Sequence, residues 1–528
     1  MRTPHRLLAT ALVVLGCGGG RPDVWDRPRE VYGPVPLKDA VAYVDTAREV
    51  VVMARVGTGT PELDEIPVGH RPRFAQPTPD GQRLIVLTRG LEARRQGERD
   101  EPPGLYVIDV LDPAAPPVRF DLEAPFDRLA VTRDGRHVVA HFGPYAGTDQ
   151  DFFRNPNELA VLDLDAPPGD DNPTFRTIRS FSTAPTGVVL SPPMVVPGDP
   201  DGTPRVFAFV LAPGTVTMLD VTRPKLREVS LRLTTTGETV AAEELVFAPQ
   251  AGAAFIRASG ARDVLAVQLS YEAPRADIPD DNDVRPSLAE LGAGGRPADL
   301  AVFDGVDGVR RVVVATPGLS EVALIDTETA EVVRVPVPDP VDRILLVPED
   351  APRVAVFASL STRAPRLHVL PLDQLTGSLF PARVETIPVG APIFDAVAVP
   401  GRDGILLVHD DARTVLGMLD VPTGTVAPIE GLGRLDAWTF TANGSHLAGA
   451  SLGIQRIGFL GLDDLHPTDL RLDAAPRAIL ALASGGIWID HGDRLGMATW
   501  LPSVEATRAD AVVYEGFLAE GLFDVEEE

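Results

Sequence analysis

The stretch "TPDGQRLIVL", Thr78 to Leu87, carries the turn signal on which the fold prediction rests. Two close relatives recur downstream, "TRDGRHVVAH" from Thr132 to His141 and "TANGSHLAGA" from Thr441 to Ala450. Each places a Thr two residues before an Asp-Gly or Asn-Gly pair, and a largely apolar run follows. These dipeptides favour hairpin turns because Gly adopts positive φ without steric cost. A hairpin signal that returns along the chain indicates a repeated β-unit.

A short apolar strand that ends in Asp supports the repeat. It occurs at Leu105–Asp109, Leu159–Asp163, Val216–Asp220, Val322–Asp326 and Gly417–Asp420, with weaker copies at Val50–Ala54, Val264–Gln268, Leu367–Pro371, Ile457–Gly461 and Leu495–Thr499. The copies return about every 50 residues, which gives ten candidate units. Two runs separated by a turn precede this strand, and a last strand such as Ile66–Gly69 or Ile387–Gly390 follows it. Four short strands per unit predict the blades of a β-propeller.

One blade cannot bury both faces of its sheet, so blades must stack into a ring with short, protected edges. We therefore predict an all-β fold, a β-propeller of about seven to ten four-stranded antiparallel blades. A single ring is favoured over two, although Glu272 to Ser287 could link two rings. No segment combines sustained helical periodicity with caps at both ends, so few helices are expected.

This order of elements resembles the YVTN family of bacterial β-propeller repeats. The resemblance is carried by Pro79–Gly81, Val107–Asp109 and Ile66–Gly69, and it covers roughly Leu37 to Phe523. The YVTN tetrapeptide itself appears only in degraded form, at Ala42–Asp45. YVTN-like propellers are similar to lactonase-type propellers, and that resemblance implies chemistry based on channel-facing carboxylates, His and sometimes a metal.

The N-terminus predicts export and a lipid anchor. Arg2 and Arg6 precede an apolar stretch, Leu7 to Leu15, that is far too short to cross a hydrocarbon core of ~30 Å. The segment Val14 to Cys17 resembles the lipobox of bacterial lipoproteins, which implies cleavage before Cys17 and lipidation of that residue. An ordinary secretory signal with a chance Cys is the alternative.

The predicted organisation is a signal peptide at 1–16, a lipidated N-terminus and linker at 17–36, and a propeller at 37–528. Cys17 is the single Cys, so the mature chain has no disulfide. We expect an envelope protein anchored to a membrane, with the outer membrane favoured by Gly18 after Cys17. The propeller would lie in the periplasm or at the cell surface.

The charge of the chain argues against nucleic-acid binding. The net charge is −27 and the isoelectric point is about 4.7. A polyanion repels phosphate backbones, and no basic block offsets this charge. No other apolar run approaches the length of a transmembrane helix.

The sequence lacks the common catalytic signatures, such as HExxH, G-x-S-x-G, the P-loop and the Rossmann fingerprint. One set of carboxylates instead precedes the first strand of many blades. The set is Asp127, Glu244, Asp299, Asp342, Asp395 and Asp436. First strands line the channel of a propeller, so these groups predict a negative rim suited to calcium or to a basic partner. The alternative is that each carboxylate accepts hydrogen bonds from backbone N–H groups of its own turn.

Two acidic loops, Gly169–Asn172 and Asp280–Asp283, also have a composition that suits calcium, but they lack EF-hand spacing. His137 and His141 share one strand face but lie too far apart for one metal ion. His409–Asp411 and Asp490-His491 fall at predicted turns.

The favoured function is a cell-envelope lipoprotein whose propeller is a non-catalytic platform for a protein or glycan partner. The alternative is a lactonase-like hydrolase that uses the rim carboxylates, with or without a metal. Periplasmic sensing or metal handling would draw on the same rim carboxylates. Fold analogy cannot choose between them.

Overall fold

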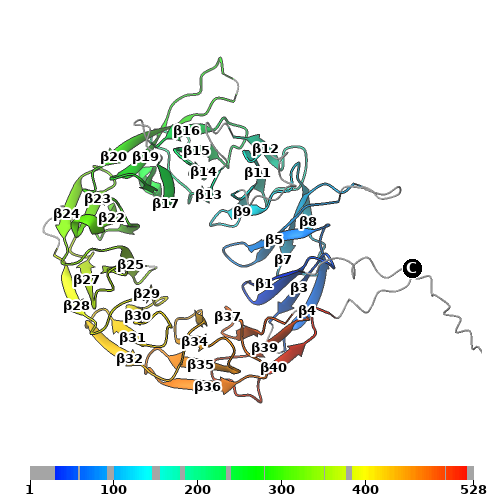
Figure 1. Cartoon of the computed structure of the whole chain (residues 1–528). Helices are drawn as coiled ribbons and strands as arrows, with labels where there is room; N and C mark the ends of the chain where they lie inside the picture. The colour runs from blue at the N-terminus through cyan, green and yellow to red at the C-terminus, as the bar shows by residue number, and fades with distance from the viewer. Residues whose placement is uncertain are drawn as a thin grey trace, which may run out of the picture.

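A computed structural model describes residues 30–56, 60–91, 100–144, 155–178, 185–233, 240–278, 280–349, 351–375, 383–493 and 495–519. The predicted signal peptide and Cys17 lie outside the described residues. The described chain forms ten four-stranded antiparallel sheets, each built from four consecutive strands. These sheets are the blades of one ring, with the first strand of each blade near the centre and the fourth at the circumference (Figure 1).

Blades 1 to 5 hold β1 to β20. Their bounds are β1 Val31–Pro36, β2 Ala40–Asp45, β3 Val50–Arg55, β4 Glu62–Pro67; β5 Pro72–Pro77, β6 Arg83–Thr88, β7 Gly104–Asp109, β8 Val118–Asp121; β9 Arg128–Val131, β10 His137–His141, β11 Glu158–Asp163, β12 Thr174–Thr177; β13 Gly187–Leu190, β14 Phe207–Ala212, β15 Thr215–Asp220, β16 Val229–Arg232; β17 Ala241–Ala248, β18 Ala253–Ser259, β19 Val264–Tyr271, β20 Val284–Leu291.

Blades 6 to 10 hold β21 to β40. Their bounds are β21 Asp299–Asp304, β22 Arg310–Thr316, β23 Glu321–Asp326, β24 Val332–Pro336; β25 Arg343–Val347, β26 Val354–Ala358, β27 Arg366–Pro371, β28 Glu385–Pro388; β29 Asp395–Ala398, β30 Gly404–Val408, β31 Leu416–Asp420, β32 Thr425–Ile429; β33 Ala437–Phe440, β34 His446–Ala450, β35 Arg456–Gly461, β36 Pro467–Arg471; β37 Ala478–Ala481, β38 Ile487–Asp490, β39 Met497–Leu501, β40 Val512–Glu515. Two 3₁₀ turns, η2 Pro249–Ala251 and η3 Pro317–Leu319, are the helical elements of the described residues.

The all-β propeller prediction is confirmed, with ten blades in one ring. Each of the ten apolar segments that defined the repeat overlaps the third strand of a blade. The weakest copy, Leu495–Thr499, is displaced by two residues from β39, which begins at Met497. The segment Glu272 to Ser287 is not an inter-ring linker, because it connects β19 to β20 and enters β20 within blade 5.

The recurring Thr-x-Asp-Gly motif is a hairpin turn between first and second strands, as predicted. In the β5–β6 turn, the Thr78 hydroxyl donates to Asp80 Oδ1 at 2.6 Å and accepts the Arg83 amide at 3.0 Å. Gly81 has a φ of 68°, and a Cβ there would lie 2.6 Å from the Lys38 amide nitrogen of blade 1. The motif therefore recurs because it closes the hairpin and also fits the turn against the neighbouring blade.

Ten hydrophobic clusters hold the ring together, one at each interface between neighbouring blades. Alternation along β6 shows the cause. Leu84 and Val86 pack toward blade 1, whereas Ile85 and Leu87 pack toward blade 3. Successive strand residues point to opposite faces of the sheet, so a strand buried on both faces must be apolar throughout. Each fully buried aliphatic side chain stabilises the fold by about 1.5–3 kcal/mol.

The ring closes at the interface between blade 10 and blade 1, which we call the seam. Blade 1 contains only the first four strands and blade 10 only the last four, so no sheet combines strands from the two ends of the chain. The seam depends instead on a cluster that includes Tyr43, Trp488 and Phe517. Main-chain contact adds to it, since the Ala483 amide donates to the Lys38 carbonyl oxygen at 3.1 Å.

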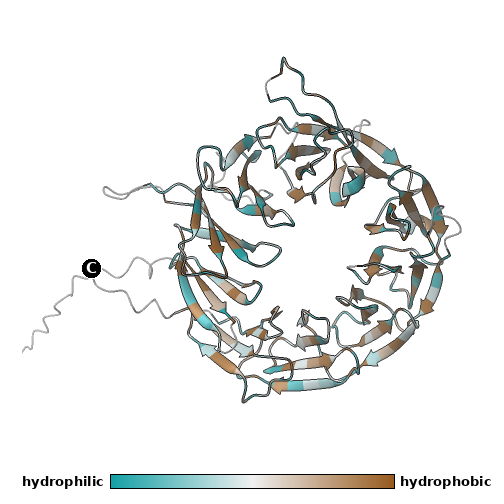
Figure 2. Ribbon diagram, turned by 180° about the vertical axis from the view of Figure 1, so that it is seen from behind, coloured by the Kyte–Doolittle hydropathy of each residue, from teal (hydrophilic) through white to brown (hydrophobic). Residues whose placement is uncertain are grey.

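The first strand of a blade is less buried than the two middle strands. The strands β14 and β15 are buried along their whole length, whereas β13, the first strand of the same blade, is only half-buried. Figure 2 shows hydrophobic residues in the strands all round the ring. The first strands therefore present partly exposed side chains toward the ring centre.

The first blade begins earlier than the sequence boundary suggested. We expected a linker through residue 36, but Val31–Pro36 forms β1. Pro34 and Pro36 cannot donate to a ladder, which made the segment look unlike a strand. As an innermost edge strand, β1 pairs only with β2, so the missing donors are tolerated. Within the described residues, no helix is long and apolar enough to cross a membrane.

Candidate functional site

The rim carboxylates gather on one face of the ring. We call it the entry face, because every first strand begins there and every turn between second and third strands lies there. Asp127, Asp342 and Asp436 immediately precede their first strands, and Asp299 and Asp395 are the first residues of theirs. Three of the six carboxylates thus precede their first strands as the sequence predicted, and two others begin theirs.

Three of these aspartates make the same hydrogen bond in different blades. In each case the carboxylate accepts a backbone amide two residues beyond the end of the second strand. The bonds are Gly143 N to Asp127 Oδ1 at 2.7 Å, Leu360 N to Asp342 Oδ1 at 2.7 Å and Leu452 N to Asp436 Oδ2 at 2.9 Å. The second oxygen of Asp342 also accepts the Ser361 amide at 2.7 Å. These carboxylates therefore fix the entry-face turn of their own blade.

Asp299 connects two blades. Its Oδ1 accepts the Leu300 amide at 3.0 Å, and its Oδ2 accepts the amide of Ile344 in blade 7 at 2.6 Å. Burial raises the pKa of Asp299, and these amide donors act in the opposite direction. Asp395 has a more local role, since its Oδ1 accepts the Ala396 amide at 2.9 Å.

Glu244 differs from the other five carboxylates. It lies inside β17, next to a register irregularity, and not before the strand as the repeat predicted. The extra residue of the irregularity shifts the register, which the sequence pattern could not reveal. Arg257 donates to Glu244 Oε2 at 2.8 Å, and burial raises the pKa of Glu244.

The structure does not bring these groups together as a metal cluster. Across the ranges that the model describes, no three His, Cys, Asp or Glu residues are grouped so as to hold a metal ion. Glu244 and Asp299 are near enough to interact electrostatically, and Arg257 and Arg343 lie near this pair. Cation binding at the rim stays a prediction.

Burial or ion pairing accounts for three of the other sequence candidates, His137, His141 and the acidic loop at 280–283. His137 and His141 are both buried on β10, and burial lowers the pKa of each. In the acidic loop at 280–283, Arg275 donates to Asp281, which lowers the pKa of this carboxyl. Asp283 accepts from the buried Arg205 at 2.6 Å. This loop is therefore neutralised by arginine.

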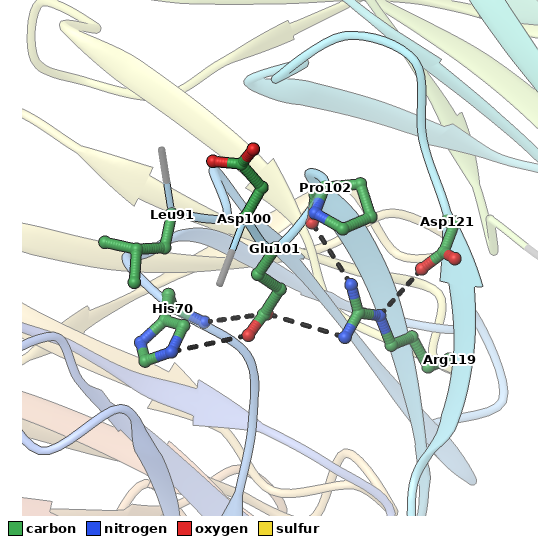
Figure 3. Close-up of a pocket in the computed structure, with 7 residues that line it drawn as sticks. All are labelled: His70, Leu91, Asp100, Glu101, Pro102, Arg119 and Asp121. Atoms are coloured by element: carbon green, nitrogen blue, oxygen red, sulfur yellow. Dashed lines mark hydrogen bonds and ion pairs between the residues drawn. The ribbon is translucent and has the colours of Figure 1, made fainter. Parts of the chain in front are cut away.

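A pocket that the sequence did not predict lies on the entry face between blades 1 and 2. It is a cavity of about 520 Å³ lined by His70, Glu101 and Arg119, among other residues (Figure 3). His70 lies in the connection from β4 to β5, Glu101 precedes β7, and Arg119 is on β8. Figure 3 shows Glu101 between the imidazole and the guanidinium group.

The pocket contains an imidazole between two carboxylates. His70 Nδ1 lies 2.7 Å from Glu49 Oε2, and its Nε2 lies 3.4 Å from Glu101 Oε2. Arg119 Nε lies 2.8 Å from Asp121 Oδ1 in an ion pair, and Arg119 Nη1 lies 3.5 Å from Glu101 Oε1. A His oriented by a carboxylate can move a proton, and an Arg can hold an anionic group. Because these residues are far apart in the sequence, no local motif could have revealed the pocket.

Comparison with known proteins shows similarity in fold alone. No family model matches the chain, and no curated protein matches it. Similar solved structures include a eukaryotic initiation factor, at 14% identity and a TM-score of 0.41, covering 76% of this chain and 88% of that one. A dihydro-heme d1 dehydrogenase is 12% identical, with a TM-score of 0.40 and coverage of 85% and 79%. The Cps50 β-propeller domain of Myceliophteria thermophila is 11% identical, with a TM-score of 0.32 and coverage of 83% and 97%. The chain is a ten-bladed β-propeller protein, and its function must be argued from its own residues.

Proposed function

We propose that this protein is a lipid-anchored protein of the bacterial cell envelope whose propeller is a non-catalytic binding platform, with its entry face toward the membrane. The observation that carries the proposal is a group of exposed aliphatic side chains on that face. Platform partners, a protein or a glycan, would then bind the surfaces that remain free.

The exposed aliphatic residues are in entry-face turns between second and third strands of blades 6, 8, 9 and 10. They are Leu319, Val415, Leu452, Ile454 and Leu495, between 47% and 57% exposed. Four of them lie in the consecutive blades 8, 9 and 10, and exposed apolar side chains that gather on one face are typical of surfaces that contact a partner or a membrane. Arg363, Arg413 and Arg434 lie in entry-face loops of the same half of the ring. Arg363 and Arg434 are ion-paired with Asp411 and Asp436. Arg413 is therefore the cation in these loops that we propose for an anionic headgroup.

The position of the chain start supports the same orientation. The first described residue, Glu30, precedes β1 and therefore lies on the entry face. If Cys17 carries lipid, the intervening chain spans at most about 45 Å. The lipid would then hold the entry face near the bilayer, and the aliphatic tips would add apolar contacts to it.

Two measurements test the proposal separately. Incorporation of labelled palmitate in the native host should occur in the wild type and be lost in Cys17→Ser. Vesicle sedimentation should use the full mature chain carrying Cys17→Ser, with vesicles of phosphatidylglycerol and phosphatidylethanolamine. We expect Leu452→Ser with Ile454→Ser to lower the partition coefficient about tenfold, because two aliphatic contacts are lost.

The opposite face offers a matched control. Leu111 and Val306 are 67% and 63% exposed and lie in turns of that face. Leu111→Ser with Val306→Ser should leave vesicle binding unchanged. An equal loss of vesicle binding in the two double variants, or no binding by the unlipidated parent, would contradict the proposal that the entry face is oriented toward the membrane. Absence of palmitate label would remove the anchor.

A second candidate is a hydrolase of the lactonase-like type, and the His70 pocket specifically favours it. A carboxylate-oriented imidazole beside Arg119 could activate water against a lactone or sugar ester. Hydrolysis of a lactone panel that is lost in His70→Gln and retained in Asp342→Asn would support this function. Activity that depends on the rim aspartates would instead place the catalytic site at the rim. If no lactone is hydrolysed, the non-catalytic binding platform remains the proposed function.

The rim remains a candidate cation site. Calcium at millimolar concentration added to metal-free protein should raise the melting temperature if the rim binds it. Asp299→Asn with Asp395→Asn should abolish that rise. No rise would remove calcium from the proposal.

A further inference from the structure

A second cavity lies on the entry face, at the seam. Its volume is about 420 Å³, within the range of small-molecule sites. Blade 1 contributes Val31 and Tyr43, and blade 10 contributes Arg477, Asp490 and Leu518, among other residues. Both ends of the propeller chain are thus needed to form it.

Blade 10 departs from the repeat at the two positions that build this cavity. In blade 9, the Asp436 amide bonds the carbonyl oxygen of Ala450, the last residue of the second strand, at 3.0 Å. In blade 10, the same backbone bond joins Arg477 to Asp490 at 2.7 Å. Blade 10 thus has a cation, Arg477, where blade 9 has the acid Asp436. It has an acid, Asp490, where blade 9 has the small apolar residue Ala450. A Cβ at Gly492 would lie 2.6 Å from Arg477 Cδ, so the swapped arginine packs on a glycine.

Asp490 has an unused acceptor. Its side chain is only 4% exposed, and its Oδ1 accepts the Tyr43 hydroxyl at 3.1 Å. Trp488 Nε1 in turn donates to the Tyr43 hydroxyl oxygen at 2.8 Å. Asp490 Oδ2 has no hydrogen-bond partner among the described residues. Burial raises the pKa of Asp490. A buried carboxylate oxygen without a donor is costly, so a ligand that brings a donor would be favoured.

The charges around the cavity favour a cationic donor. Glu30, Asp490 and Asp493 line it together with a single cation, Arg477, among the described lining residues. A metal ion is disfavoured, because this part of the described chain holds no group of three metal-ligating side chains. We propose that the seam cavity binds a primary ammonium group on a short apolar stem, with the ammonium donating to Asp490 Oδ2 and the stem packing near Leu518. This inference goes beyond the platform function and does not depend on the lipid anchor.

The test is calorimetric titration of the full mature chain with n-butylamine, which has the charge and stem of a lysine side chain. Butanol and butyrate are the neutral and anionic controls. We expect butylammonium to bind and both controls to fail. Asp490→Asn keeps an acceptor for Tyr43 but removes the charge, and it should weaken binding about tenfold or more.

Arg477→Gln should change affinity in the opposite direction, because it removes the cation that repels the ligand. A severalfold tighter binding of butylammonium by this variant supports the proposal independently of the result for Asp490→Asn. Asp304→Asn, an exposed acid in blade 6, should have no effect. Equal affinity for butanol, binding of butyrate, or unchanged affinity in Asp490→Asn would overturn the inference. Nα-acetyl-lysine amide in place of butylamine distinguishes the sources: tighter binding of this amide indicates a lysine of a protein partner, and weaker binding indicates a free amine.

Discussion

Replacement of Tyr43 by Phe should open the ring at the seam. The hydroxyl that is lost accepts from Trp488 Nε1 at 2.8 Å and donates to Asp490 Oδ1 at 3.1 Å. Both partners are buried, at 0% and 4% exposure. Phe keeps the aromatic ring and lacks only the hydroxyl group, so the loss of stability from an added cavity is small. Each buried group left without a partner costs about 1–3 kcal/mol, which gives about 3 kcal/mol in total.

Hydrogen exchange is the appropriate assay, because a chain of ten blades need not unfold in one step. If the free energy of local opening falls by about 3 kcal/mol, amide exchange should accelerate about a hundredfold. We expect this acceleration in β2 and β38, which flank the seam, and not in β22 on the opposite side of the ring (Figure 1).

Tyr106→Phe is the matched control. Its hydroxyl lies at the hydrogen-bond limit of 3.5 Å from Glu101, and the residue belongs to the core between blades 1 and 2. This variant should change exchange at the seam by less than threefold or so. Unchanged protection in Tyr43→Phe would refute the reasoning. So would an equal loss in every blade, because the ring would then not open preferentially at its chain ends.

Three further predictions concern charged side chains. Asp342→Ala should lower the free energy of unfolding by about 1–2 kcal/mol in urea titration, because two backbone amides lose their acceptor; Asp395→Ala, with one local amide, should cost about half as much. Arg205→Met should cost about 3–5 kcal/mol, because Asp283 and its acidic neighbours would stay buried without a counter-charge; a cost below about 1 kcal/mol would contradict this. Burial raises the pKa of Asp490 in the folded state, so this carboxyl contributes stability at low pH that is lost as the pH rises through its folded pKa. The Asp490→Asn variant should therefore gain melting temperature over the wild type at about pH 7, and the gain should shrink toward about pH 4, below which the wild-type group is neutral in both states.

The blade pattern was predictable because its causes are local. The Thr78 and Asp80 side chains satisfy the turn within six residues, and Gly81 supplies the positive φ. Alternate residues of a middle strand point to opposite faces of the sheet, and both faces are buried against neighbouring blades. The middle strands are therefore apolar throughout, as along β6. The edge strand β1 was missed because proline is tolerated only where one side of a strand needs no partner, and the sequence does not show which side is free.

The candidate sites were less predictable. The rim aspartates were found, because repetition places them in register, but not their partners. Whether a carboxylate accepts amides of its own turn, as Asp342 does, or of the next blade, as Asp299 does, depends on how the sheets stack. The displacement of Glu244 depends on a strand irregularity.

By itself, the sequence determined that the chain is a series of four-stranded units, because hairpin turns and alternating burial are encoded within a few neighbouring residues. Only the tertiary structure decided that ten such units close one ring, since closure depends on the angle at which each sheet packs on the next. It also decided which distant residues meet. Tyr43 and Asp490 are 447 positions apart and become hydrogen-bond partners only because the last blade packs against the first.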